Sequence, residues 1–306
     1  MEEVLKITNV SKSFGKIKAV NNISFKVKKG EMFAYLGVNG AGKSTTISMI
    51  CGTLKNDSGS IIVCGEDINK NSKYIKNKIG VVFQNSVLDQ TLSVYDNLKY
   101  RASLYDITGE KFKKRFGELA NMFELTEIQN QKVKTLSGGQ RRRVDIARAI
   151  IHEPEFLILD ESTTGLDPNT RKKLWNIIRN LREKNGMTVF LTTHYMEEAS
   201  DADFIIIIEK GKIITEGTPL DLKNKYAKDI INIYHIEEND IMKLKLPYTK
   251  IRDGFKLEVE DTSVATDLII KNKEIFKDYE IIKGKMDDVF LNATGNDLEV
   301  SNEKNN

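Results

Sequence analysis

A glycine-rich turn between an apolar strand and a helix constrains this chain more than any other feature of its sequence. Residues 32–36 (MFAYL) predict a buried strand, and the next nine residues read GVNGAGKST. This segment fits the pattern G-x-x-x-x-G-K-[ST], in which glycines let successive backbone N–H groups converge on phosphates. A glycine turn without a ligand is the alternative. The flanking strand and helix favour a phosphate site that consists of Gly37, Val38, Asn39, Gly40, Ala41, Gly42, Lys43, Ser44 and Thr45.

Lys43 and Ser44 in this turn, and two acids after another strand, have side chains suited to phosphate and cation binding. Lys43 opens the helix, whose positive dipole end faces the phosphates. We expect Lys43 to reach the β- and γ-phosphates and the Ser44 hydroxyl to ligate Mg²⁺.

A second apolar strand, residues 156–159, is followed by Asp160 and Glu161. By themselves these could be two acids exposed to solvent. Beside a phosphate site, Asp160 would hold Mg²⁺ and Glu161 would deprotonate the attacking water.

A second helix start in the chain has the chemistry of an anion site. Residues 136–140 read LSGGQ, and Ser137 can cap a helix that continues to Ile151. The two glycines expose further backbone donors, so this helix end could bind a phosphate as well. An ordinary capped helix is the alternative.

LSGGQ upstream of the LILDE strand resembles the signature motif of ATP-binding cassette (ABC) ATPases, and further motifs of that family follow the family's order. Gln84 resembles the Q-loop glutamine, Asp167 the D-loop aspartate and His194 the H-loop histidine. Phe14 resembles the aromatic residue that stacks on adenine. The resemblance covers about residues 4–217.

The resemblance implies ATP and Mg²⁺ as cofactors and a head-to-tail homodimer with two ATP molecules between the subunits. Lys43, Glu161 and His194 would carry catalysis, and Ser44, Gln84 and Asp160 would surround Mg²⁺. Each ATP would also contact the signature motif of the other chain, namely Ser137, Gly138, Gly139 and Gln140.

Two positions depart from the family's pattern. Val38 and Ser162 stand where transport ATPases usually have proline. Neither position supplies a charge or a ligand, so we expect modest changes in loop stiffness and intact catalysis.

The order of strands and helices predicts an α/β fold with a largely parallel sheet. The resemblance implies the P-loop NTPase fold of ABC ATPases with an N-terminal antiparallel β subdomain. There, residues 5–10 and 23–27 predict strands, and Asn21 and Asn22 predict a turn between them. Helical periodicity between residues 93 and 123 predicts an inserted helical subdomain at about 90–135.

A boundary is predicted at the sequence Gly217-Thr218-Pro219. Thr218 can cap a helix that starts at Pro219 and runs to about Tyr226. We therefore expect an ABC ATPase domain at 1–217 and a small α+β extension with a polar tail at 218–306.

Composition and charge exclude several classes of protein. The net charge of +3 is too small for a typical nucleic-acid-binding face, so we expect no nucleic acid. The longest apolar runs are far shorter than the roughly 20 residues of a membrane span. The first ten residues lack the basic start of a secretory signal, and Cys51 and Cys64 have the isolated spacing of reduced, buried thiols. These features predict a cytoplasmic chain.

Two short motifs resemble those of one branch of the family. Residues 191–199 (LTTHYMEEA) and 286–295 (MDDVFLNATG) resemble the daunorubicin-type exporter ATPases, which pair with ABC-2 type permeases. The chain would then energise export of a drug, lipid or similar compound from the inner face of the cell membrane. Residues 85–105 would receive the permease. A soluble regulatory or nucleic-acid-associated ABC ATPase without a permease is the alternative.

Overall fold

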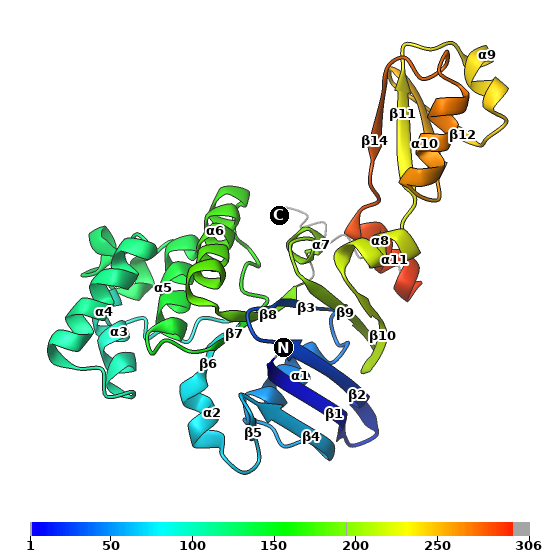
Figure 1. Ribbon diagram of the computed structural model, residues 1–306. Coiled ribbons are helices and arrows are strands. Elements are labelled where there is room, and N and C mark those ends of the chain that lie inside the picture. Colours follow the sequence, from blue (N-terminus) through cyan, green and yellow to red (C-terminus); the bar gives the residue numbers. More distant parts are fainter. Residues whose placement is uncertain (1, 194, 296–306) are drawn as a thin grey trace. The chain divides into compact units, whose positions relative to one another are not determined.

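The computed structural model describes residues 2–193 and 195–295, which form two compact units (Figure 1). The first unit consists of Met1–Tyr195 and Ala202–Ile213, and the second of Met196–Asp201 and Ile214–Asn306. The chain enters the second unit within strand β10 (Lys212–Gly217), a few residues before the predicted boundary. His194 and the polar tail from residue 296 lie outside the described residues.

A six-stranded sheet forms the centre of the first unit, in the order β10-β9-β3-β8-β7-β6. The pairs from β9 through β6 are parallel. Parallel sheets are covered on both faces, which explains the unbroken apolar runs in the sequence. The strands β3, β7 and β8 are accordingly buried at every residue. Besides β10, the strands are β9 (Phe204–Glu209), β3 (Met32–Leu36), β8 (Thr188–Thr193), β7 (Phe156–Asp160) and β6 (Ile79–Val82).

An antiparallel sheet at the N-terminus has the order β2-β1-β4-β5. Its strands are β1 (Glu3–Phe14), β2 (Ile17–Lys28), β4 (Ser58–Val63) and β5 (Glu66–Asp67). The predicted turn at Asn21 and Asn22 is wrong, because both residues lie inside β2. Asn22 has a φ of 55°, and the pairing with β1 shifts register nearby, so the asparagines form an irregularity of one long strand. The actual turn is at Gly15 and Lys16.

Aromatic side chains from both sheets form the core of the first unit. Phe25 of β2 stacks on Phe33 of β3, and Phe33 stacks on Phe190 of β8, with centroid distances of 5.5 Å in both pairs. Burial of each such side chain contributes about 2 kcal/mol. Of the two cysteines, Cys51 is buried as predicted, but Cys64 is only half-buried, and both are free thiols.

The helices of the first unit fall into two groups. The regular elements between residues 94 and 135 are all helices, and Lys132 adds an isolated β-bridge to Ser93, in agreement with the predicted helical periodicity. They are α3 (Val94–Ser103), α4 (Gly109–Met122), η1 (Thr126–Ile128) and η2 (Val133–Thr135), followed by the long α5 (Gly138–Ile150). The remaining helices are α1 (Lys43–Ile50), α2 (Ser72–Lys78) and α6 (Pro168–Asn185).

The second unit contains a four-stranded antiparallel sheet in the order β12-β13-β11-β14. Its elements follow one another as βαββαβ, which is the ferredoxin-like arrangement. Its members are β11 (Asp229–Tyr234), α9 (Glu238–Ile241), η3 (Met242–Leu244), β12 (Tyr248–Ile251), β13 (Gly254–Val259), α10 (Thr262–Lys271) and β14 (Tyr279–Ile282). The sequence did not predict β12 or α9, because both are only four residues long and at least half of the residues in each are polar.

Two helices flank this sheet in the sequence and pack on each other, α8 (Pro219–Tyr226) and α11 (Met286–Thr294). The predicted capping residue of α8 is present, because Thr218 accepts a hydrogen bond from the N–H of Asp221 at 3.2 Å. The amide of Asn292 donates to the carbonyl of Tyr226 at 2.7 Å. The unit also includes the short α7 (Met196–Ala199). No helix in residues 2–193 and 195–295 has the length and apolar character of a membrane span.

Candidate active site

The glycine-rich turn joins β3 to α1, and its backbone leaves no room for side chains at two positions. Gly42 precedes the helix with a φ of 109°, and a Cβ there would lie 2.3 Å from the carbonyl oxygen of Ala19. A Cβ on Gly37 would lie 2.5 Å from the carbonyl oxygen of Ile208. Both glycines are therefore required by the close approach of neighbouring backbone.

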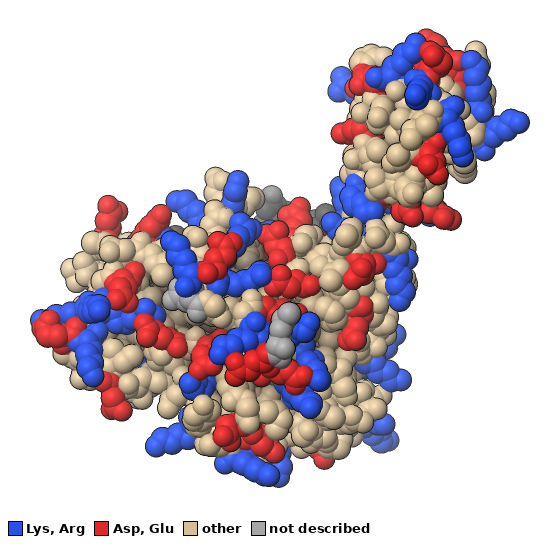
Figure 2. Space-filling model, in the orientation of Figure 1, with Lys and Arg blue, Asp and Glu red and all other residues tan. Residues whose placement is uncertain are grey.

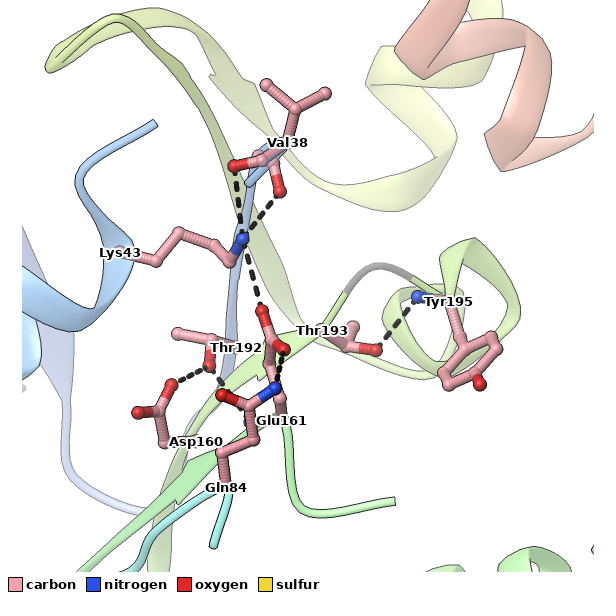
Figure 3. A network of polar contacts seen from close by, with 9 residues as sticks. Val38, Lys43, Gln84, Asp160, Glu161, Thr192, Thr193 and Tyr195 are labelled. Carbon is pink, nitrogen blue, oxygen red and sulfur yellow. Dashed lines mark hydrogen bonds and ion pairs between the residues drawn. The ribbon is translucent and has the colours of Figure 1, made fainter. Parts of the chain in front are cut away.

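Lys43 is buried, and its ammonium group is surrounded by oxygen atoms (Figure 3). Its Nζ donates to the carbonyl oxygens of Gly37 at 2.7 Å and Val38 at 3.2 Å. The same Nζ lies 3.3 Å from Oε1 of Glu161. The turn therefore places a positive charge near the end of β3 and pairs it with Glu161, the residue that follows β7.

The two acids at the end of β7 are both buried, with 7% of Asp160 and 8% of Glu161 exposed. Burial raises the pKa of Asp160, and the negative charge of Glu161 adds to this, although the hydroxyl of Thr192 donates to Asp160 at 2.7 Å. Glu161 has a φ of 44°, in the left-handed region that side chains rarely adopt. Buried carboxylates and unusual backbone often mark functional sites.

Gln84 lies just after β6, and its side chain points to the acid pair (Figure 3). Its Nε2 donates to Oε2 of Glu161 at 3.0 Å. The structure thus brings together Lys43, Gln84 and the acid pair, which come from three separate parts of the sequence. The side chain of Ser44 is exposed at the start of α1.

The LSGGQ segment starts α5 through a capping box. The N–H of Gln140 donates to Oγ of Ser137 at 3.2 Å, and the N–H of Ser137 donates to the Gln140 side chain at 2.9 Å. Ser137 and Gly138 are exposed, and a Cβ on Gly139 would lie 2.6 Å from Thr170. The capping box therefore leaves an exposed helix start at Ser137 and Gly138.

Two further predicted residues, Phe14 and Asp167, make local contacts of their own. Phe14 ends β1 with half of its surface exposed, and Nζ of Lys12 lies 5.8 Å from its ring centroid. Asp167 caps α6 by accepting from the N–H of Thr170 at 3.0 Å. His194 is not among the described residues. Of the two departures from the family's pattern, Val38 is exposed and Ser162 is buried.

Comparisons with known proteins decide the family of this chain. Residues 20–164 match the family described as "ABC transporter". The linearmycin resistance ATP-binding protein LnrL of Bacillus subtilis is 39% identical over 273 residues, which are 89% of this chain and 84% of that protein. The chain belongs to the ABC transporter family. The daunorubicin resistance ATP-binding protein DrrA3 of Streptomyces coeruleorubidus is 32% identical to this ABC protein over 98% of each chain.

Solved structures of ABC cassettes share the fold. The cbiO1 protein of Clostridium perfringens, part of the complex cbiONQ, aligns with a TM-score of 0.68 and 28% identity, over 72% of this chain and 91% of that one. The dimeric cassette MJ0796 bound to ADP and Pi aligns with a TM-score of 0.65 and 31% identity, over 70% and 98%. The predicted P-loop fold is confirmed, and this ABC protein is an ATPase that binds ATP.

Sequence reasoning missed the residues that hold the segment around Gln84 in this ABC ATPase. The guanidinium of Arg142 on α5 is buried and donates to the carbonyl oxygens of Phe83 and Gln84, both at 2.8 Å. Asp145, one turn later, accepts from the hydroxyl of Ser86 at 2.9 Å. Two charged residues of α5 therefore hold the segment that carries Gln84. Their only sequence signal was a charge on an otherwise apolar helix face.

Proposed function

We propose that this ABC ATPase hydrolyses ATP at the cluster around Glu161 and energises export through a separate ABC-2 type membrane permease. The observation that carries the proposal is the convergence of Lys43, Gln84 and the acid pair at the ends of β3, β6 and β7 (Figure 3). Ligands of open α/β sheets bind at the carboxyl ends of the strands.

The residues present suit Mg²⁺. A hydroxyl, an amide oxygen and a carboxylate are the oxygen ligands that this cation prefers. Ser44, Gln84 and Asp160 would hold it, and a cation would offset the burial that raises the pKa of Asp160. When bound, Mg²⁺ neutralises charge on the β- and γ-phosphates.

The protein's own side chains then account for hydrolysis. Lys43 turns its ammonium group from the loop carbonyls to the β- and γ-phosphates, where it stabilises the negative charge on the phosphate oxygens. Glu161 orients a water molecule and accepts its proton. The water oxygen bonds to the γ-phosphorus, and the bond from that phosphorus to the β–γ bridging oxygen breaks, which releases ADP and phosphate. His194 is proposed to contact the γ-phosphate, and Phe14 to stack on adenine.

The complete site is proposed to need a second copy of the chain. Ser137 and Gly138 present an exposed helix start to which the chain's own glycine-rich turn is not hydrogen-bonded in the described residues. A head-to-tail homodimer would place this helix start, with Gly139, Gln140 and the D-loop residue Asp167, at the partner's ATP. The similar cassette MJ0796 was solved as a dimer.

A permease contact is supported by exposed apolar side chains in the stretch 85–105. Val87, Tyr100 and Leu104 are exposed at 47%, 59% and 72%. Two of the similar proteins are named as resistance proteins for linearmycin and daunorubicin, which supports export. On the face drawn in Figure 2, basic and acidic side chains are interspersed, so no single-sign surface on that face favours nucleic acid. The chain would be cytoplasmic, on the inner face of the membrane.

Glu161→Gln tests the catalytic proposal. We expect turnover to fall at least about 100-fold, in the range of a lost general base, while ATP affinity is retained. The variant should also accumulate an ATP-dependent dimer in size-exclusion chromatography. Glu155→Gln, just before the opposite end of β7, is the matched control and should hydrolyse ATP normally. Full activity of Glu161→Gln would remove this residue from the mechanism.

Leu104→Glu tests the permease proposal. The wild type, co-expressed with a neighbouring membrane-protein reading frame, should be recovered with the membrane, and the variant should shift to the soluble fraction. Ile270→Glu, a similarly exposed apolar residue of the second unit, should not shift it. Recovery of the wild type only in the soluble fraction, together with a salt-sensitive gel shift with DNA or RNA, would favour the alternative without a permease.

A further inference from the structure

Thr192 on β8 hydrogen-bonds both to Asp160, the last residue of β7, and to Glu161, which follows it. The parallel pairing of the strands sets Asp160 beside Thr192. The hydroxyl of Thr192 donates to Oδ1 of Asp160 at 2.7 Å and accepts from the N–H of Glu161 at 3.1 Å. Only 2% of Thr192 is exposed. One buried hydroxyl therefore uses its donor and its acceptor on two successive residues of the proposed catalytic centre (Figure 3).

The backbone of Glu161 needs such support. Its φ of 44° is left-handed, which costs a residue other than glycine about 1 kcal/mol or more. The N–H of Glu161 is shared between the hydroxyl and the carbonyl oxygen of Thr192, at 3.1 Å each. With the backbone held in this conformation, the carboxylate reaches Lys43 and Gln84.

We propose that Thr192 is a positioning residue for ATP hydrolysis, whose hydroxyl fixes both the carboxylate of Asp160 and the backbone of Glu161. This inference rests on the proposed roles of the two acids. Threonine suits the task because its branched Cβ restricts the side-chain rotamer on a strand, so the hydroxyl is held in one direction. Valine keeps this shape without the hydroxyl, and serine keeps the hydroxyl without the methyl group.

A purely structural role is the competing explanation, because buried threonines on strands usually satisfy a neighbouring polar group. The same strand offers a matched control. Thr188 begins β8, is fully buried, and its hydroxyl accepts from the N–H of Gly30 at 2.9 Å. Thr188→Val removes an equivalent hydroxyl far along the strand from the acid pair, so it reports the structural effect alone.

The experiment compares the full-length Thr192→Val, Thr192→Ser and Thr188→Val variants with the wild type. ATPase kcat and KM are measured together with the thermal midpoint. Binding of a non-hydrolysable ATP analogue is measured with and without Mg²⁺. We expect Thr192→Val to lower kcat about 10- to 100-fold, as positioning changes do, and to reduce the gain in analogue affinity that Mg²⁺ gives. Its affinity without Mg²⁺ should stay within about threefold of the wild type.

The controls should separate positioning from stability. Thr192→Ser should recover kcat to within about threefold of the wild type, and Thr188→Val should lower the thermal midpoint with kcat unchanged. The proposal is overturned by a Thr192→Val kcat near that of the wild type, by an equal loss in Thr188→Val, or by failure of serine to rescue. If Thr192→Val does not fold, Thr192→Ala carries the same expectations. Full activity of Glu161→Gln would instead count against the proposed function.

Discussion

The two units of this ABC ATPase each bury an aspartate at a strand, and their environments differ. In the second unit Asp229 is 1% exposed, and three groups donate to its carboxylate: the Thr262 hydroxyl at 2.6 Å, the Lys283 ammonium at 3.0 Å and the Gly284 N–H at 3.1 Å. For Asp160, the described residues show one hydrogen bond to the carboxylate, from Thr192.

This difference moves the two pKa values in opposite directions. Burial would raise the pKa of Asp229, but the hydrogen bonds from Thr262, Gly284 and Lys283 outweigh it and lower the pKa. For Asp160 burial dominates and raises the pKa. A buried carboxylate that its own chain satisfies serves the fold, whereas one that its chain leaves partly unsatisfied is suited to a ligand.

The largest expected contrast is between the lysines that accompany the two sites. Lys43→Ala should weaken ATP binding about 100-fold, because charge-assisted bonds to the phosphates are lost. Lys283→Ala, which removes a donor to Asp229, should leave ATP affinity unchanged. Isothermal titration of ATP into both variants measures this. Unchanged affinity in Lys43→Ala would argue against the phosphate site.

Asp229→Asn should destabilise the second unit by about 2 kcal/mol, because the lysine and glycine donors lose a charged acceptor. Hydrogen exchange of peptides from β11 and β14 measures this locally. ATPase activity should persist, since the contacts of Asp229 lie within the second unit. Unaltered exchange in these strands would contradict a structural role.

Asp160→Asn should have the opposite effects. Removing a buried charge should raise the stability of the first unit by on the order of 1 kcal/mol, as is common when functional groups are replaced. Hydrolysis should be lost, because Asp160 is a proposed ligand of Mg²⁺. The fluorescence of Trp175, the chain's single tryptophan, reports urea unfolding of this unit. A destabilised Asp160→Asn would place Asp160 in the same structural class as Asp229.

Acid should produce the smallest of these effects, and it should shrink the stability differences between the wild type and both aspartate variants. The folded-state pKa of Asp229 is lowered, so its contribution is complete above the ordinary aspartate value of about 3.9 and is lost as the pH falls through the folded-state pKa. The stability difference between wild type and Asp229→Asn should therefore shrink in that range. For Asp160, whose pKa is raised, ionisation opposes folding, so acid should diminish the gain from Asp160→Asn. Urea unfolding at a series of pH values tests both trends.

Much of the fold followed from local sequence patterns. The strand-to-helix turn, the capping residues Ser137 and Thr218, and the apolar strands of the parallel sheet all appear where predicted. The prediction of a turn at Asn21 and Asn22 was wrong, because asparagine tolerates a positive φ inside a strand as well as in a turn. The strand β12 was missed because half of its residues are polar and its partners lie elsewhere in the chain.

The sequence by itself predicted a phosphate site in this chain, because a glycine turn and a helix cap need only residues that are three or four positions apart. The tertiary structure decided which side chains surround that site. Gln84 meets Glu161 across 77 residues, and Thr192 meets Asp160 across 32. Such pairs depend on which strands lie side by side and in which register, and no local propensity encodes that choice. The same holds for the difference between Asp160 and Asp229. It arises from the donors that surround each carboxylate, which come from distant parts of the sequence.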